Sequence, residues 1–151
     1  MNLPPCGLYR TRAAIGPIPE GRLVYFHNHG DPGPGLYLPQ SWAHNRVKLQ
    51  PKGTLLPSPD DVRALEPLPP QGFYRVTEPF FCCEKRCRQF QPELLVQLGY
   101  DGQGRGILFL PELVDGQLVV PDRGNAIDPA HFDKLRKLAL RESDRGPGDP
   151  H

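Results

Sequence analysis

The sequence lacks long hydrophobic segments and a strong net charge, and both absences exclude classes of function. No run of about 18 apolar residues occurs, so we expect no membrane-spanning helix and no membrane partner. The 18 lysine and arginine residues against 17 aspartate and glutamate residues give a formal net charge of +1, so only a local patch could attract nucleic acid. The first residues, Met1–Cys6, show neither the basic nor the apolar region of a signal peptide. We therefore expect a cytoplasmic protein.

Recognisable catalytic motifs are also scarce. The serines, Ser41, Ser58 and Ser143, do not stand in a nucleophile-elbow context. The glycine-rich segment Gly102–Gly106 lacks the lysine and the serine or threonine of a phosphate-binding loop, and this segment indicates a hairpin loop instead. No spacing of carboxylates favours acid–base chemistry. We therefore predict that the protein is not an enzyme, has no catalytic residues and needs no cofactor.

Proline and glycine, in contrast, are abundant. The sequence has 20 prolines and 16 glycines among 151 residues, and both residue types interrupt helices and central strands. Hydrophobic residues make up 38% of the chain, which is too many for wholesale disorder. This composition predicts short strands joined by rigid turns.

The order of motifs repeats along the chain. A Gly-x-Tyr-Arg motif, an apolar run, a glycine-rich turn and a capped helix start occur twice in the same order. The clearest pairs are GLYR with GFYR (7–10 and 72–75), LYLPQ with LFLPE (36–40 and 108–112), and Ser58-Pro59 with Asp128-Pro129. The strands that this repeat predicts lie near residues 8–15, 22–28, 36–38, 45–49, 73–78, 94–98, 107–110 and 117–120. The order of the matches indicates a tandem duplication.

These patterns predict a mainly β fold with short helices. Closure removes the exposed edges of so short a sheet, so we expect two tandem small β-barrel-like repeats packed as one compact unit. The architecture resembles SH3-like barrels at the level of the fold. The expected parts are a first repeat over 1–66, a proline-rich connector over 67–71, a second repeat over 72–141 with a cysteine-containing insertion, and a disordered tail over 142–151. A C-terminal α-helix is predicted from about Pro129 to Arg141, because Phe132, Leu135 and Ala139 would share one face.

The first repeat concentrates aromatic and histidine side chains. Small barrels bind peptides on aromatic-lined grooves, so these residues form the candidate binding surface of a non-enzymatic protein-interaction or structural module, with another protein as partner. A simpler alternative is that Trp42 and Tyr37 fill the core between the repeats. A homodimer is compatible with the apolar surface that small barrels leave. The candidate residues are Tyr25, Phe26, His27, His29, Tyr37, Trp42 and His44.

The cysteines support an alternative function, a zinc-stabilised nucleic-acid-binding protein. Three of them lie in the insertion of the second repeat, and thiolates bind Zn²⁺. The candidate ligands are Cys6, Cys82, Cys83 and Cys87. The competing interpretations are that the cysteines of the insertion fill a small core or that Cys87 pairs with Cys82 or Cys83.

The same insertion carries Lys85, Arg86 and Arg88 between phenylalanines, a composition typical of a nucleic-acid patch. The competing interpretation is that these charges are the solvated tip of a hairpin.

A second alternative is a metal-dependent hydrolase. His27, His29 and Asp31 form an H-x-H-x-D sequence that resembles the metal motif of metallo-β-lactamase-type hydrolases. The resemblance covers five residues, and Pro32 then stands where that family has its next histidine. It implies a metal held by these three side chains.

Overall fold

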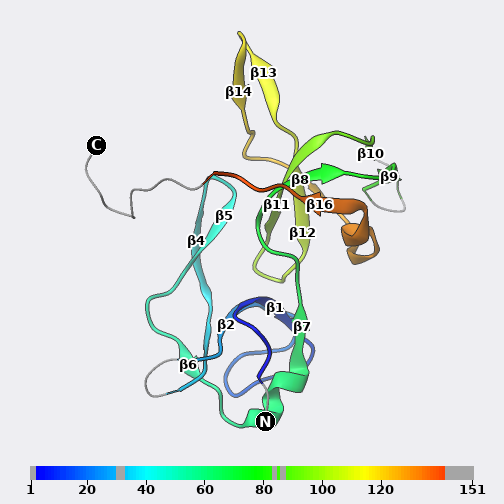
Figure 1. Cartoon of the computed structure of the whole chain (residues 1–151). Coiled ribbons are helices and arrows are strands. Elements are labelled where there is room, and N and C mark those ends of the chain that lie inside the picture. The colour runs from blue at the N-terminus through cyan, green and yellow to red at the C-terminus, as the bar shows by residue number, and fades with distance from the viewer. Residues whose placement is uncertain (1–2, 30–32, 83–84, 86–87, 142–151) are drawn as a thin grey trace, which may run out of the picture.

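The computed structural model describes residues 3–29, 33–82, 85 and 88–141 (Figure 1). The fold is mainly β, with two short 3₁₀ helices. In chain order the elements are β1 (Gly7–Thr11), β2 (Leu23–His27), β3 (Gly35–Tyr37), β4 (Pro39–Ala43), β5 (Arg46–Leu49), β6 (Thr54–Leu55), η1 (Pro59–Ala64), β7 (Leu65–Pro67), β8 (Gly72–Val76), β9 (Phe80–Phe81), β10 (Gln89–Phe90), β11 (Leu95–Tyr100), β12 (Gly106–Phe109), β13 (Glu112–Val114), β14 (Gln117–Val119), β15 (Asn125–Ala126), η2 (Pro129–Lys134) and β16 (Leu135–Lys137). Each of the eight predicted strand regions overlaps one of these strands.

Two antiparallel sheets of five strands form the body of the protein. The first has the order β6-β3-β2-β1-β7 and the second the order β15-β12-β11-β8-β16, so the chain runs through both sheets in the same sequence of positions. The register corresponds as well: Gly7 lies opposite Phe26 in the first sheet, and Gly72 lies opposite Leu98 in the second.

Equivalent tyrosine hydrogen bonds lie at the first strand of each sheet. The Tyr9 hydroxyl donates to the carbonyl of Pro5 at 2.7 Å, and the Tyr74 hydroxyl donates to the carbonyl of Pro70 at 2.5 Å. In both cases the acceptor lies four residues before the tyrosine. Each bond therefore fixes the proline-rich segment that leads into the first strand of its sheet.

The two sheets share a hydrophobic core. One cluster of buried side chains contains Leu8 and Leu23 from the first sheet together with Val96 and Leu108 from the second. A second cluster, which includes Phe26 and Leu36, lies within the first half of the chain. The shared cluster joins the two halves of the chain, each of which is too small to bury a large core of its own.

The prediction of barrel closure was wrong. Each sheet is open, and no strand pairing among the described residues joins β6 to β7 or β15 to β16. The chain leaves the sheet after β3 and after β12 to form separate two-stranded hairpins, β4–β5 and β13–β14, and it returns to the same edge only as the two-residue strands β6 and β15. In the β4–β5 hairpin, the strand register shifts between Pro39 and Ser41.

The predicted C-terminal α-helix is also absent from the described part of the chain. Helix η2 has six residues, and at Leu135 the backbone becomes extended (φ −117°, ψ 134°). Strand β16 then pairs with β8, with Leu135 opposite Val76. The apolar spacing of Phe132 and Leu135 fits a helix. A longer helix, however, would leave the backbone N–H and C=O groups along the edge of β8 without partners, and strand β16 pairs with them.

The predicted helix starts are present, and one has the expected cap. The Ser58 side chain accepts a hydrogen bond from the Asp60 backbone N–H at 3.3 Å, and the Asp61 carboxylate accepts one from the Ser58 N–H at 3.1 Å. This reciprocal pair is a capping box. At η2, the Asp128 side chain makes no capping hydrogen bond.

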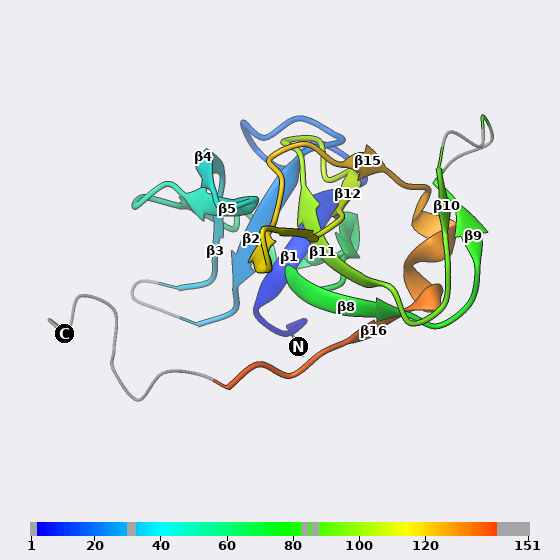
Figure 2. The same ribbon diagram turned by 90° about the horizontal axis from the view of Figure 1, so that it is seen from above.

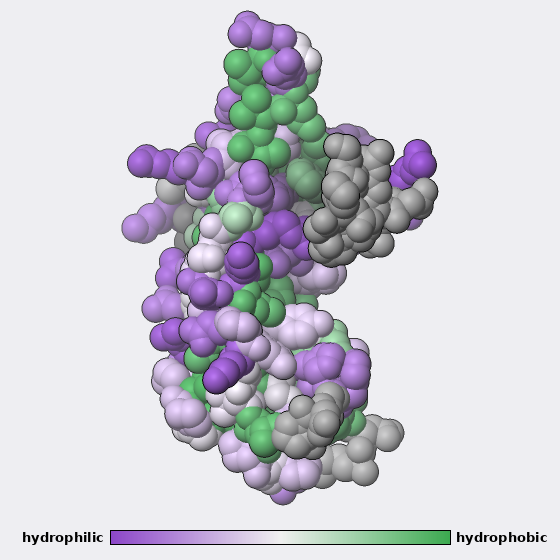
Figure 3. Space-filling view, turned by 90° about the vertical axis from the view of Figure 1, so that its left-hand side faces the viewer, coloured by the Kyte–Doolittle hydropathy of each residue, from purple (hydrophilic) through white to green (hydrophobic). Residues whose placement is uncertain are grey.

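The three hairpins outside the main sheets differ in their surroundings. Seen from above, β4–β5 lies on one side of the sheets and β9–β10 lies with η2 on the opposite side (Figure 2). Hairpin β13–β14 projects from the end of the molecule, and its hydrophobic side chains are visible on the surface (Figure 3). Leu113 on this hairpin is 76% exposed.

Hairpin β4–β5 is held against strand β11 by side-chain hydrogen bonds. The Asn45 amide donates to Gln97 Oε1 at 3.0 Å and to the carbonyl of Pro121 at 2.8 Å. The Gln97 amide in turn donates to the carbonyl of His44 at 3.0 Å. These bonds fix the tip of a first-half hairpin on the second sheet.

The structure contains no helix, within the residues it describes, with the length and apolar character needed to cross a membrane.

Replacement of Gly99 by alanine should loosen the contact between hairpin β4–β5 and strand β11. A Cβ at Gly99 would lie 2.5 Å from the carbonyl oxygen of Asn45, so strand and hairpin must separate. We expect Gly99→Ala to lower the free energy of unfolding by about 1–3 kcal/mol in urea denaturation. Gly102→Ala is the matched control, since its Cβ would meet only the Trp42 ring, at 3.8 Å. Equal stability of the two variants would contradict the close approach.

Candidate functional site

The residues predicted as one binding surface lie in several places. Phe26 is fully buried and belongs to the core, because it lies opposite Leu36 on the inward face of the first sheet. Its place in the predicted surface is therefore corrected. Tyr25 packs against the shared core. Tyr37 is half-buried, with its ring against Gly53.

Trp42 and His44 line a groove of about 480 Å³ between the two halves of the chain, which we call the Trp42 groove. The turn of hairpin β4–β5 forms one wall, and the ends of β11 and β12 form the other. The residues at the tip of this hairpin, His44 and Asn45, have positive φ values of 52° and 64°, which are typical of the tight turns that match the twist of a hairpin. The groove is lined by Trp42, His44, Asn45, Tyr100, Asp101, Gly102, Ile107, Phe109 and Asp122.

Trp42 is fixed at one edge and open on its face. Its indole N–H donates to the carbonyl of Tyr100 at 2.6 Å, while 44% of the residue remains exposed. The protein has one tryptophan. An aromatic ring that is oriented by a hydrogen bond and still accessible is suited to contact another molecule.

The charged side chains of the Trp42 groove are acidic. Asp101 accepts hydrogen bonds from the backbone N–H groups of Gln103 and Arg105, both at 2.9 Å, and lies 3.6 Å from the Arg105 guanidinium. Asp122 is exposed and forms no ion pair within the described ranges. None of the described residues that line the groove is a lysine or arginine, and Asp122 has no ion partner among them, so the field near Asp122 favours a cation.

The sequence alone pointed to only part of this groove. Trp42 and His44 were candidates, whereas Asp122 and Phe109 were not, because they come from the other half of the chain. Asp101 precedes the predicted hairpin loop Gly102–Gly106 and was not a candidate either. These residues meet because hairpin β4–β5 packs against β11 through side-chain hydrogen bonds, and sequence spacing does not contain that contact.

Two buried tyrosines donate hydrogen bonds to the proline-rich connector, residues 67–71. The Tyr100 hydroxyl donates to the carbonyl of Pro69 at 2.6 Å, next to the bond from Tyr74 to Pro70. Burial raises the pKa of Tyr74 to about 12. Burial, with a smaller contribution from Tyr74, also raises the pKa of Tyr100 well above its usual range. Both hydroxyls are therefore held in the neutral, donating form.

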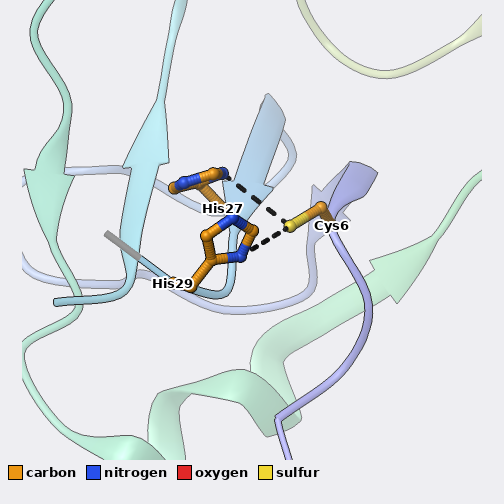
Figure 4. A group of neighbouring side chains, drawn as sticks. All are labelled: Cys6, His27 and His29. Carbon is orange, nitrogen blue, oxygen red and sulfur yellow. Dashed lines mark hydrogen bonds between the residues drawn. The ribbon is translucent and has the colours of Figure 1, made fainter.

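His27 and His29 lie with Cys6 rather than with Trp42 (Figure 4). The Cys6 Sγ lies 3.8 Å from the Nδ1 of each histidine. Among the residues that the structure describes, these three form the group with metal-binding proximity. Cys82, another predicted ligand, is buried in the shared core instead. Cys83, Cys87 and Asp31 lie outside the described residues.

The predicted nucleic-acid patch has mixed surroundings. Lys85 and Arg88 are exposed, and Arg86 lies outside the described residues. Lys85 lines a second groove, of about 780 Å³, together with basic and acidic side chains from both halves. These charged residues are Arg10, Glu66, Arg105 and Asp128. The carboxylates in this groove offset the field that a phosphate backbone would need.

Comparison with known proteins gives no relative: no family model, curated protein or solved structure matches this chain.

The raised pKa values of Tyr74 and Tyr100 predict a loss of stability in alkali. An unfolded tyrosine ionises near pH 10, so above that pH the folded state binds more protons than the unfolded state. Stability from these groups is complete below about pH 10 and declines as the pH rises toward 12. We expect urea unfolding midpoints to fall more steeply between pH 9 and 11.5 in the native protein than in a Tyr74→Phe/Tyr100→Phe variant. Parallel pH profiles would show that the hydroxyls are not held neutral.

Proposed function

We propose that the protein is a non-enzymatic interaction module of two tandem SH3-like units, which binds an extended, basic, proline-containing segment of a partner protein in the Trp42 groove. The observation that carries the proposal is the half-exposed indole of Trp42, held at a junction that both halves of the chain line and whose charged side chains are acidic. The units comprise residues 1–66 and 72–141, and residues 67–71 connect them.

The tandem arrangement is supported by correspondences that extend beyond sequence motifs. The two sheets have equivalent strand orders, and Gly7 and Gly72 occupy equivalent positions in their registers. The hydrogen bonds of Tyr9 and Tyr74 reach equivalent prolines. In each half, a six-residue 3₁₀ helix leads directly into the last strand.

The chemistry of the occupant follows from the groove lining. Aromatic and apolar surface from Trp42, Ile107 and Phe109 suits the rings of prolines, whose polyproline II conformation loses little entropy on binding. A lysine or arginine in the same segment would stack on the indole of Trp42 and approach Asp101 or Asp122. Both contacts favour a cationic segment over an acidic one.

Tryptophan fluorescence tests the proposal directly, because Trp42 is the single tryptophan of the protein. The probes are a synthetic proline-rich decapeptide with two arginines and the same peptide with glutamate in their place. We expect a saturable shift of the emission with the arginine peptide, weakened by added salt, and none with the glutamate peptide. No shift with either peptide, or equal binding of both, would refute the assigned occupant.

Asp122→Asn isolates the electrostatic contribution of the groove. We expect this change to weaken binding of the arginine peptide by about twofold to fivefold, since an exposed ion pair contributes up to about 1 kcal/mol. Glu112→Gln, an exposed carboxylate on β13 outside the groove, is the matched control and should leave the affinity unchanged. An equal loss in both variants would indicate a nonspecific charge effect and not a site.

A further inference from the structure

The side chains of Cys6, His27 and His29 converge where the adjacent strands β1 and β2 of the first sheet begin and end, and none of them lines the Trp42 groove. The β1–β2 ladder explains the convergence. Gly7 lies opposite Phe26, so the preceding residue, Cys6, comes beside His27. His29 follows two positions later, in the bend after β2, and its Nδ1 also lies 3.8 Å from Cys6 Sγ.

The segment before Cys6 is fixed in place by two hydrogen bonds. The Tyr9 hydroxyl donates to the carbonyl of Pro5 at 2.7 Å, and the Asn28 side-chain amide donates to the carbonyl of Pro4 at 3.0 Å. The Asn28 backbone N–H also donates to Cys6 Sγ at 3.3 Å. Cys6 Sγ in turn donates to Asn28 Oδ1 at 3.2 Å, so Asn28 holds the sulfur in place.

The distances among the three side chains match those of a shared ion. In tetrahedral zinc sites the metal lies about 2.3 Å from sulfur and about 2.0–2.1 Å from nitrogen, which places sulfur and nitrogen about 3.6 Å apart. The two observed Sγ–Nδ1 distances are both 3.8 Å. Both imidazoles approach the sulfur from the same side (Figure 4). Both Sγ–Nδ1 distances therefore lie within about 0.2 Å of the spacing in a tetrahedral zinc site.

We propose that Cys6, His27 and His29 bind one zinc ion, with the fourth position open to water or to a donor from another molecule. One thiolate and two imidazoles suit a borderline-soft ion, whereas Ca²⁺ and Mg²⁺ take oxygen ligands. On binding, the Cys6 thiol releases its proton to solvent and His29 takes the tautomer with its proton on Nε2. The Zn–S and Zn–N bonds then replace the hydrogen bonds to Asn28 Oδ1 from Cys6 Sγ, at 3.2 Å, and from His29 Nδ1, at 2.7 Å. The ion would tie the start of β1 to the end of β2.

Metal titration of the purified full-length chain tests this site. With Co²⁺ as a spectroscopic probe for Zn²⁺, we expect one ion per chain, a thiolate-to-cobalt charge-transfer band and displacement by Zn²⁺. Zinc should also raise the melting temperature, because it binds the folded state. Cys6→Ser should abolish the charge-transfer band, and His29→Gln, at an exposed position, should weaken binding by more than about 100-fold while leaving the fold intact.

The controls separate this site from other thiols and histidines. His131→Gln and a Cys83→Ser/Cys87→Ser double variant should retain one bound ion and the charge-transfer band. Loss of the ion in the double variant but not in Cys6→Ser would assign the metal to the insertion and overturn the proposal. Failure of the native chain to bind a stoichiometric ion would overturn it as well. Peptide binding in the Trp42 groove is measured separately, so either proposal can fail alone.

Discussion

Tyr100 connects the two halves of the chain through three parts of one residue. Its carbonyl accepts the indole N–H of Trp42, its hydroxyl donates to the carbonyl of Pro69, and its ring is buried in the shared core, 6.3 Å from that of Phe132. The hydroxyl is 31 residues from its acceptor and the carbonyl 58 residues from its donor. A buried hydroxyl without an acceptor costs about 1–3 kcal/mol, so the Tyr100 hydroxyl holds the connector at Pro69. Because the carbonyl of the same residue holds Trp42, the path of the connector and the position of Trp42 depend on each other.

The shared core explains why two short sheets form one body. Leu8 and Leu23 belong to the first sheet, yet they are buried with residues of the second, and a backbone hydrogen bond of 2.9 Å from the Leu23 N–H to the Gly102 carbonyl reinforces the contact. Each half is below the size at which a hydrophobic core alone gives comfortable stability. The Trp42 groove lies along this junction, so the interface that stabilises the fold also shapes the candidate site.

Local features of the fold could be predicted from the sequence, and long-range ones could not. The repeated order of motifs predicted the strand regions, and Ser58-Pro59 predicted the start of a capped helix. Leu135 was assigned to a helix because a three-residue apolar spacing does not reveal that the edge of β8 needs a partner. The same holds for the candidate site. Trp42 could be chosen from the sequence because it is the single tryptophan, but Asp122 lines the Trp42 groove only because the two halves of the chain pack together. The clustered cysteines drew attention to the insertion, whereas Cys6 meets two histidines through the β1–β2 ladder, 21 and 23 residues away.

One strand position shows how equivalent sheets come to differ. Gly99 follows the residue opposite Gly72, and His27 follows the residue opposite Gly7, so the two occupy equivalent places in β11 and β2. In the second sheet, the missing side chain lets the Asn45 carbonyl come within 2.5 Å of where a Cβ would stand, and hairpin β4–β5 closes over β11. In the first sheet, an imidazole fills that place and turns toward Cys6. Equivalent positions of the two sheets thus hold a docked hairpin in one half of the chain and a candidate metal ligand in the other.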